Sequence, residues 1–281
     1  MPDPQKTTVD TLPLTGKAAA APLIPLRAGM PALDTVHSTK QFAPVPNGPT
    51  YNIISTTETD SYEKSAPAKN VPKLLQSTPS PSSAAVAAAL KSKPPAGDNF
   101  GGTDRKAAKL SKGTGPTEQF SDLKDLIASL ASESTMINHK PKIATNANSG
   151  RVKEEERNVR VSAFLYAASR EADNDFHMII GRDHTATPEM YMTMELSGLP
   201  PKNAPTFADL NNARKAFKKF FGKNLPGMTY DFYDPPIPVQ IEGSLFFDMT
   251  HAKGSRPGPP SLKSRMPVIW EVHPVTSIKL G

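Results

Sequence analysis

Apolar and polar residues alternate with a period of two along much of the C-terminal half of the chain. Three such runs, at 159–168, 176–180 and 190–196, predict β-strands separated by short polar turns. Two more apolar runs, at 237–248 and 268–275, predict a fourth and a fifth strand, joined by a long loop rich in Gly, Pro and basic residues. We therefore expect the folded part of the molecule to be built around these strands.

The segment between the third and the fourth strand has a helical period instead. Its apolar stripe consists of Leu210, Ala213, Phe217 and Phe220. Thr206 and Asp209 have the spacing of a near capping box, and Gly222 is suited to end the helix. The resulting order, β-β-β-α-β-β, predicts a mainly β fold with one helix: a five-stranded OB-like barrel over residues 151–281. A half-open α+β sheet with the same order of elements is the alternative.

Residues 1–116 have no such sustained pattern and are rich in Pro, Ala and Ser. Residues 1–150 hold 17 of the 30 prolines but 5 of the 19 aromatic residues. Few large apolar side chains are available there to offset a backbone ordering cost of roughly 1–2 kcal/mol per residue. We therefore predict a long disordered N-terminal arm over residues 1–116.

Residues 117–133 form the most regular segment before the predicted domain. Phe120, Leu123, Ile127 and Leu130 recur there at helical spacing, with charged residues between them. This pattern predicts an amphipathic helix. Such a helix either packs on the domain that follows or binds a partner protein.

Composition narrows the class of protein only a little. The net charge of +6 and the pI near 9.3 are a mild basic excess. The chain has no cysteine, which excludes disulfides, thiolate metal sites and a cysteine nucleophile. The first residues lack the apolar run of a signal peptide, and no stretch is apolar over the length that a membrane span requires. We expect a soluble cytoplasmic protein that does not contact a membrane.

The loop between the fourth and fifth predicted strands is basic. It carries Lys253, Arg256, Lys263 and Arg265, with no acidic residue between Asp248 and Glu271. In an OB-like domain this loop commonly grips nucleic acid or sugar. We therefore predict a non-catalytic binding module, without a cofactor, for an anionic ligand, and we expect that ligand to be single-stranded nucleic acid. The alternative is that the loop is basic only because basic residues keep it soluble.

A second group of residues combines carboxylates with imidazoles. Its members are Asp173, Asp175 and His177; Asp248 and His251; and Glu271 and His273. Alternation within each strand predicts that Asp173, Asp175 and His177 share one face, as do Glu271 and His273. Imidazole and carboxylate ligands suit Zn, Mn or non-haem Fe.

These residues support a second hypothesis for function, a metal-dependent hydrolase or nuclease. Its site would use Asp248, His251, Glu271 and His273, with His251, Glu271 and His273 as metal ligands, because the fourth and fifth strands pair. The second strand is expected one strand away from the fifth, at roughly 9–10 Å, which argues against a single site for all seven residues. Turn-forming aspartates and hydrogen-bonded structural histidines are the simpler interpretation. A protein-interaction module with a recruiting arm is a third hypothesis.

Three short pieces of the chain carry a resemblance. They are Asp-Asn-Asp-Phe-His-Met-Ile-Ile at 173–180, Gly-Ser-Leu-Phe-Phe-Asp at 243–248 and Glu-Val-His-Pro-Val at 271–275. Together they resemble a family of small bacterial proteins with an OB-like domain, whose pattern reads Asp-Gly-Asp-x-His, Gly-x-x-Phe-Phe-Asp and Glu-x-His-Pro-Val. Asn174 stands where that family has Gly. The resemblance covers about residues 155–281 and implies a domain boundary, but no reaction, because the family has no established activity.

Overall fold

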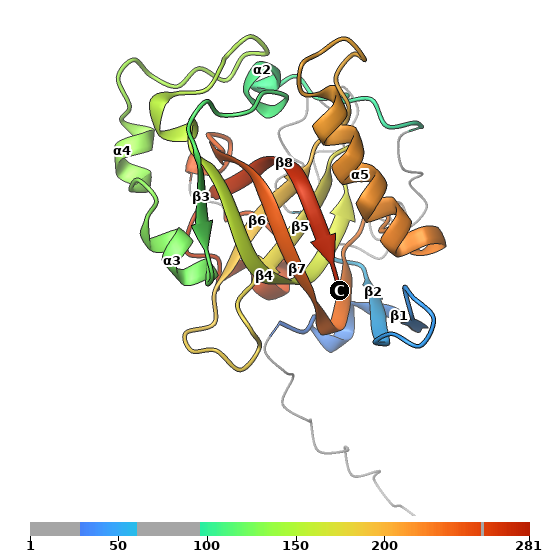
Figure 1. Cartoon of the computed structure of the whole chain (residues 1–281). Helices are drawn as coiled ribbons and strands as arrows, with labels where there is room; N and C mark the ends of the chain where they lie inside the picture. The colour runs from blue at the N-terminus through green and yellow to red at the C-terminus, as the bar shows by residue number, and fades with distance from the viewer. Residues whose placement is uncertain (1–28, 61–95, 254–255) are drawn as a thin grey trace, which may run out of the picture.

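A mixed sheet of eight strands runs through the computed structural model of the chain, which describes residues 29–60, 96–253 and 256–281 (Figure 1). The strands are β1 (Val36–Phe42), β2 (Tyr51–Thr56), β3 (Thr117–Phe120), β4 (Asn158–Arg170), β5 (Phe176–Gly181), β6 (Tyr191–Leu196), β7 (Asp231–Phe247) and β8 (Trp270–Leu280). The helices are α2 (Lys106–Lys109), α3 (Leu123–Ala128), α4 (Glu133–Ile137), α5 (Phe207–Phe221) and α6 (Pro260–Lys263), with 3-10 turns at Leu33–Thr35, Lys153–Glu155, Gly222–Asn224 and His251–Lys253.

The strands follow the order β1-β2-β7-β8-β6-β5-β4-β3 across the sheet, and β7 also pairs with β4. The β6–β8 and β3–β4 pairs are parallel, and the remaining pairs are antiparallel. The long strand β7 therefore contacts three neighbours along its length: β2, β4 and β8. This arrangement brings the ends of β5, β6, β7 and β8 close to one another.

The prediction of a five-stranded OB-like barrel is wrong. The order of elements between Asn158 and Leu280 is the expected one, with α5 between β6 and β7. The sheet nevertheless has eight strands, because β1, β2 and β3 are added to it from residues before the expected domain. β1 and β3 have polar sequences with little strand signal, and β2 is a short apolar piece of six residues. Pairing of β1 with β2, of β2 with β7 and of β3 with β4 is what orders them.

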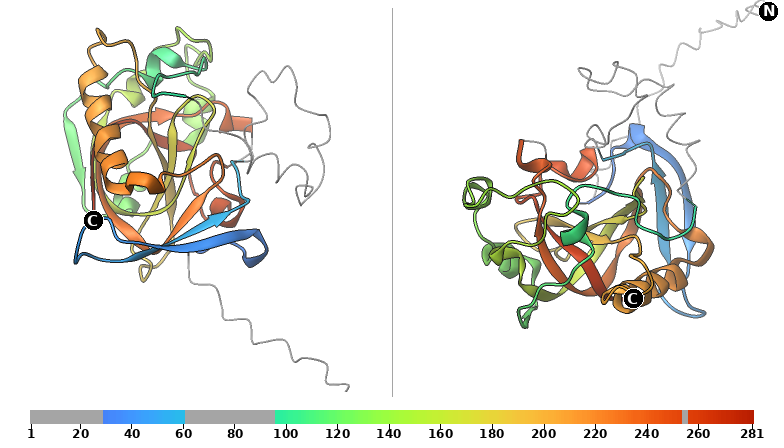
Figure 2. Two further views of the ribbon diagram at one scale, coloured as in Figure 1. Left: turned by 90° about the vertical axis from the view of Figure 1, so that its right-hand side faces the viewer. Right: turned by 90° about the horizontal axis from the view of Figure 1, so that it is seen from above.

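Residues 36–56 form two strands, which contradicts the predicted disorder of this part of the arm. β2 pairs with β7, and Ile53 is fully buried in the main core. Phe42, at the end of β1, is 6% exposed and stacks on Phe221 of α5 with ring centroids 5.5 Å apart. Figure 2 shows this hairpin lying along one side of the sheet, away from α3 and α4. The predicted disorder of residues 1–28 and 61–95 concerns residues outside the described ranges.

Replacing Phe42 with alanine is expected to lower the free energy of unfolding by about 3–5 kcal/mol, as for other buried phenylalanines. The physical reason is the lost contact with Phe221 and the cavity that remains. Urea unfolding of the variant and the wild type measures the change. Gln41→Ala, on the exposed part of the same strand, is the matched control. Equal stability of Phe42→Ala and Gln41→Ala would show that this strand does not belong to the cooperative fold.

The predicted helix at 117–133 is also wrong in its extent. Residues Thr117–Phe120 form β3 beside β4, and α3 begins only after Asp122, whose side chain accepts a hydrogen bond from the Lys124 N–H. Ser132 caps the separate helix α4. The apolar positions nevertheless pack on the main core, as one of the two interpretations expected. Parallel pairing of β3 satisfies backbone groups that an isolated helix would have satisfied internally.

The main core lies between the sheet and α5. Phe217 and Phe221 of this helix are buried among residues of the sheet, and α5 packs along β8 (Figure 1). Strands β5, β6 and β8 also carry buried ionisable residues outside the apolar core: His177 on β5, Glu195 on β6, and Glu271 and His273 on β8. No helix in the described part of the chain is long and apolar enough to cross a membrane.

Candidate functional site

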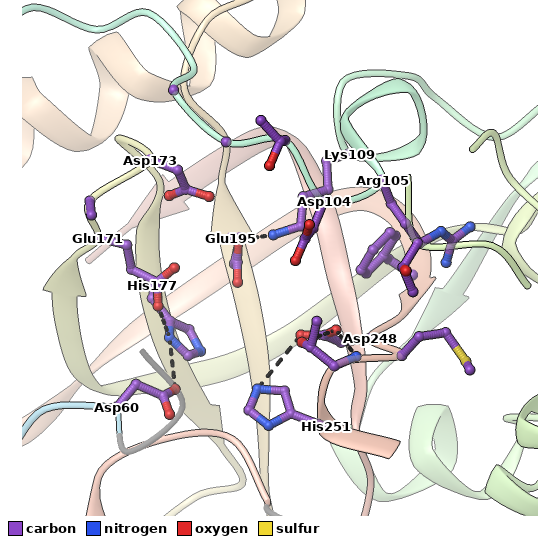
Figure 3. A pocket seen from close by; sticks show the side chains of 18 residues that line it. Asp60, Asp104, Arg105, Lys109, Glu171, Asp173, His177, Glu195, Asp248 and His251 are labelled. Atoms are coloured by element: carbon purple, nitrogen blue, oxygen red, sulfur yellow. Dashed lines mark hydrogen bonds and ion pairs between the residues drawn. The ribbon is translucent and has the colours of Figure 1, made fainter. Parts of the chain in front are cut away.

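A cavity of about 320 Å³ opens where segments from five parts of the chain meet (Figure 3). Its walls are the end of the segment after β2, residues 101–105 with α2, the β4–β5 turn, β6, and the turn after β7. The carboxylates that line it are Asp60, Asp104, Glu171, Asp173, Glu195 and Asp248. The basic groups on its walls are Arg105, Lys109, His177 and His251. Its volume falls in the usual range for small-molecule sites.

The β4–β5 turn delivers the first group of predicted residues. Asn174 has a φ of 79°, in the left-handed region, which asparagine tolerates better than most residues. Its side chain donates to Asn99 O (2.7 Å) and accepts from Arg170 (2.7 Å), so the turn is tied to the 98–102 segment. Asparagine thus serves at the position where the resembling family has glycine. The turn places Asp173 at the cavity and Asp175 behind it.

A row of charged side chains crosses three neighbouring strands below this turn. His177 of β5 is the register partner of Glu195 on β6. Met194 is paired with Val272 in the parallel β6–β8 ladder, so the next step places Glu195 beside His273. His273 Nδ1 lies 3.0 Å from Glu195 Oε2. The strand between β5 and β8 is therefore β6, and its Glu195 lies next to His177 of β5 on one side and His273 of β8 on the other.

His177 sits among acceptors at one end of this row. Its Nδ1 lies 2.9 Å from Glu171 Oε1, 3.3 Å from Asp60 Oδ2 and 3.1 Å from the Tyr230 hydroxyl. Burial alone would lower the pKa of His177, but the charges of Glu171 and Asp60 outweigh it and raise the pKa to about 10. A proton on Nδ1 therefore gives these acceptors a donor, and we interpret the contact with Glu171 as a hydrogen-bonded ion pair, while Nε2 is buried without a hydrogen-bond partner among the described residues.

The imidazole of His177 is expected to remain protonated in metal-free protein at pH 8, where an ordinary histidine is neutral. Because the folded-state pKa is raised from 6.5 to about 10, its stabilisation is complete below pH 6.5 and is lost as the pH rises through 10. NMR titration of the ring and urea unfolding between pH 6 and 10 measure both effects. His177→Gln should flatten this part of the stability profile. A ring pKa near 6.5 would contradict the assignment.

Asp175, Glu195 and His273 form a buried group at the other end of the row, the inner cluster. His273 Nε2 lies 3.5 Å from Asp175 Oδ2, and His273 and Asp175 are fully buried. Burial, together with the charges of Asp173 and Glu195, raises the pKa of Asp175 well above its usual value. Burial lowers the pKa of His273, which favours a neutral ring able to accept a bond from a cation. Asp175 Oδ1 is held by the Gly198 N–H at 2.6 Å.

Asp248, His251 and Glu271 form a second group, the outer triad, of which Asp248 and His251 line the cavity. One ligand atom from each lies within 4.8 Å of the others, and Asp248 Oδ2 is 3.6 Å from His251 Nε2. The other oxygen of Asp248 accepts the Thr250 N–H at 2.7 Å, which fixes the carboxylate. Burial, reinforced by the charges of Glu195 and Asp248, raises the pKa of Glu271 well above its usual value. Figure 3 shows Asp248 and His251 beside each other at the cavity wall.

Lys109 places a further cation at the cavity. Its Nζ lies 4.0 Å from Glu195 Oε2. Burial alone would lower the pKa of Lys109, but Glu195 and Asp173 raise it well above the usual value, so it is charged. Arg105 is differently engaged: its guanidinium donates to Glu155, Gly150 O and Phe247 O. Lys109 is therefore the residue better able to approach a negative group in the cavity.

Three of the four residues of the predicted metal site converge. Asp248, His251 and Glu271 meet in the outer triad, whereas His273 belongs to the inner cluster. Glu271 connects the two groups, since its Oε2 is 3.6 Å from His273 Nδ1. The expected face shared by Glu271 and His273 is found.

Four residues of the candidate site were not predicted from the sequence: Asp60, Lys109, Glu171 and Glu195. Glu195 is the one charged residue of the buried strand β6, and this exception was the signal that could have found it. Asp60 and Lys109 come from the segments assigned to the arm, where no pattern pointed to a site.

The basic loop is engaged in contacts within the chain. Arg256 forms an ion pair with Glu133, and Arg265 forms one with Glu189 at 2.8 Å. Lys263 is half-buried, and burial lowers its pKa. The side chain of Lys253 is not among those that the structure describes. Two of the four predicted residues are therefore already paired with carboxylates of the chain, and binding of an anionic ligand by this loop stays a prediction.

Comparison of the chain with protein-family models, curated proteins and solved structures found no match.

Proposed function

We propose that this chain is a metal-dependent hydrolase in which Asp248, His251 and Glu271 hold a divalent cation at the cavity. The observation that carries the proposal is the convergence of these three side chains within 4.8 Å, with Asp248 and His251 in the wall of a cavity of about 320 Å³ and Glu271 buried behind them. They come from the turn after β7 and from β8, so the fold itself brings them together. The proposal takes up the second hypothesis from the sequence.

The donor set fits a first-row divalent cation. One imidazole and two carboxylates suit Zn²⁺ or Mn²⁺. Glu271 is almost completely buried, and its Oε2 has no hydrogen-bond partner among the described residues. A buried carboxylate is normally paired, and an unpaired one is costly. A cation on this triad would supply the missing partner.

A cation in this position would supply an activated water, because coordination lowers the pKa of bound water to about 7. Lys109 is placed to stabilise negative charge that develops on a substrate oxygen. Asp173 lines the same cavity and can accept a proton there. This division of roles suits hydrolysis of a carboxylic ester or a phosphodiester.

The proposal is tested by treating the full-length protein with a chelator. Activity is measured on bis(p-nitrophenyl) phosphate and on p-nitrophenyl acetate, before chelation and after Zn²⁺ or Mn²⁺ is restored. We expect the activity to be lost with the chelator and to return with one of the two metals. Hydrolysis that is unchanged after complete removal of metal would contradict the proposal, as would the absence of hydrolysis in every metal-loaded sample.

Binding of single-stranded nucleic acid by the basic loop receives less support. Arg256 and Arg265 are already paired with carboxylates, so a phosphate would have to displace Glu133 or Glu189. No observation favours it over the cavity as the functional site.

A further inference from the structure

We propose that the cavity holds a second divalent cation, bound by the inner cluster of Asp175, Glu195 and His273, with Glu271 lying between the two metal sites. This inference rests on the proposed function, because the first cation is the one on the outer triad. It deepens that function from a single-metal to a two-metal hydrolase.

Unpartnered atoms inside the inner cluster point to a missing ligand. Asp175 Oδ2, Glu195 Oε2 and both ring nitrogens of His273 are buried, and none has a hydrogen-bond partner within the described ranges. Asp175 and His273 are 0% exposed, and Glu195 is 4% exposed. His273 Nδ1 lies 3.0 Å from Glu195 Oε2, an ion-pair distance, but the two atoms are not aligned as a hydrogen bond. Native structures leave few such groups without a partner.

The same atoms are those that a cation requires. One ligand atom from each of the three residues lies within 4.8 Å of the others. The set contains one imidazole and two carboxylates, the donor types of the outer triad. A cation between them would satisfy several unpartnered atoms at once, which no single hydrogen bond could do. Glu195 also lines the cavity, so the cluster is in contact with the space through which an ion would enter.

Glu271 joins the two groups of ligands. Its carboxylate belongs to the outer triad, and its Oε2 lies 3.6 Å from His273 Nδ1 of the inner cluster. In two-metal hydrolases the ions stand roughly 3.5–4 Å apart and stabilise the attacking and the leaving oxygen together. A carboxylate shared by two neighbouring sites is the geometry such a pair requires.

The Asp60–Glu171–His177 group is the competing candidate, because its ligand atoms also lie within 4.8 Å of one another. There, however, the Nδ1 of His177 already contacts Glu171, Asp60 and Tyr230. A proton on that nitrogen meets the demand of these acceptors. The inner cluster also contains ion-pair contacts, at 3.0 Å and 3.5 Å from His273. Among the described residues, however, it leaves four buried atoms without a hydrogen bond, whereas the competing group leaves only His177 Nε2, so we assign the second cation to the inner cluster.

The experiment is a metal count on the full-length protein. Metal-free protein is equilibrated with Mn²⁺ or Zn²⁺, and bound metal is measured by equilibrium dialysis with elemental analysis. The variants are His251→Ala for the outer triad, Glu195→Gln and Asp175→Asn for the inner cluster, and Asp104→Asn as control. Asp104 lines the cavity but belongs to neither group. Thermal unfolding identifies any variant that fails to fold, and the second inner variant then takes its place.

We expect about two ions in the wild type and in Asp104→Asn, and about one in each of the other variants. Two Mn²⁺ ions roughly 3.5–4 Å apart should also give a spin-coupled EPR spectrum, and the coupling should be lost in Glu195→Gln. One ion in the wild type, lost in His251→Ala and kept in Glu195→Gln, would overturn the inner site while the proposed function stands. One ion lost only in the inner variants would overturn the outer site and the two-metal pair. No bound ion in the wild type would overturn both proposals.

Discussion

Replacing His251 with alanine is expected to lower kcat/KM of the metal-dependent hydrolysis by more than about a hundredfold. Loss of a group that merely supports a metal ligand commonly costs 10–100-fold in metal affinity or activity, so loss of a ligand should exceed that range. His251 is 5% exposed and faces Asp248, at 3.6 Å between Nε2 and Oδ2. Without the imidazole, two carboxylates alone would remain to hold the outer cation.

The measurement is steady-state hydrolysis at several metal concentrations, with bound metal determined in the same samples. Glu271→Gln should reproduce the loss, since it removes a charged ligand at nearly constant size. Asp104→Asn removes a carboxylate from the same cavity and should remain within a few-fold of the wild type. Wild-type kcat/KM in a folded His251→Ala protein would remove this histidine from the site. Equal losses in all three variants would indicate a general effect of cavity charge.

Replacing Arg105 with methionine is expected to lower the free energy of unfolding by about 3–5 kcal/mol. Arg105 forms a bidentate pair with Glu155, at 2.6 and 2.7 Å, and the two side chains are 2% and 0% exposed. The substitution would leave Glu155 charged and buried, with only the N–H groups of Phe247 and Val152 as donors. Breaking one side of such a pair costs more than the pair contributes, because the remaining charge stays out of water.

Urea unfolding of Arg105→Met, Glu155→Gln and the double variant separates the contribution of the ion pair from the cost of the buried charge that remains. The double variant should be more stable than Arg105→Met, since it removes the uncompensated charge. Arg160→Met is the matched control, because Arg160 pairs with Glu242 in a partly exposed position. Its loss should cost no more than about 1 kcal/mol. Similar costs for the buried and the exposed arginine would contradict this account of the fold around the cavity.

The strands between Asn158 and Leu280 could be predicted because burial makes their sequences apolar, either at alternate positions, as in the first half of β4, or along the whole strand. Runs such as Phe176–Gly181 are buried throughout, and α5 shows its apolar stripe and its terminal Gly222. β1 could not be predicted in this way. Five of its seven residues are exposed, and its order comes from pairing with β2. A strand ordered by its neighbours rather than by its own burial leaves little trace in composition, which is why the expected domain began too late.

The candidate site could be predicted where its residues are close in sequence or lie on paired strands. Asp248 and His251 share one turn, and β7 pairs with β8, which carries Glu271. Lys109 could not be predicted, because α2 has four residues and its position depends on contacts distant in sequence. One such contact is Arg151, which donates to the carbonyls of Ala108 and His273 and so ties α2 to β8.

The most direct test of the central claim is the position of the metal in a crystal of the full-length protein grown with Mn²⁺ or Zn²⁺. Anomalous difference maps recorded on both sides of the absorption edge locate the ion without reference to activity. The account predicts a peak bonded to Asp248, His251 and Glu271, at about 2.0–2.2 Å from the ligand atoms for Zn²⁺. A metal-saturated crystal with no peak among these three side chains would contradict it.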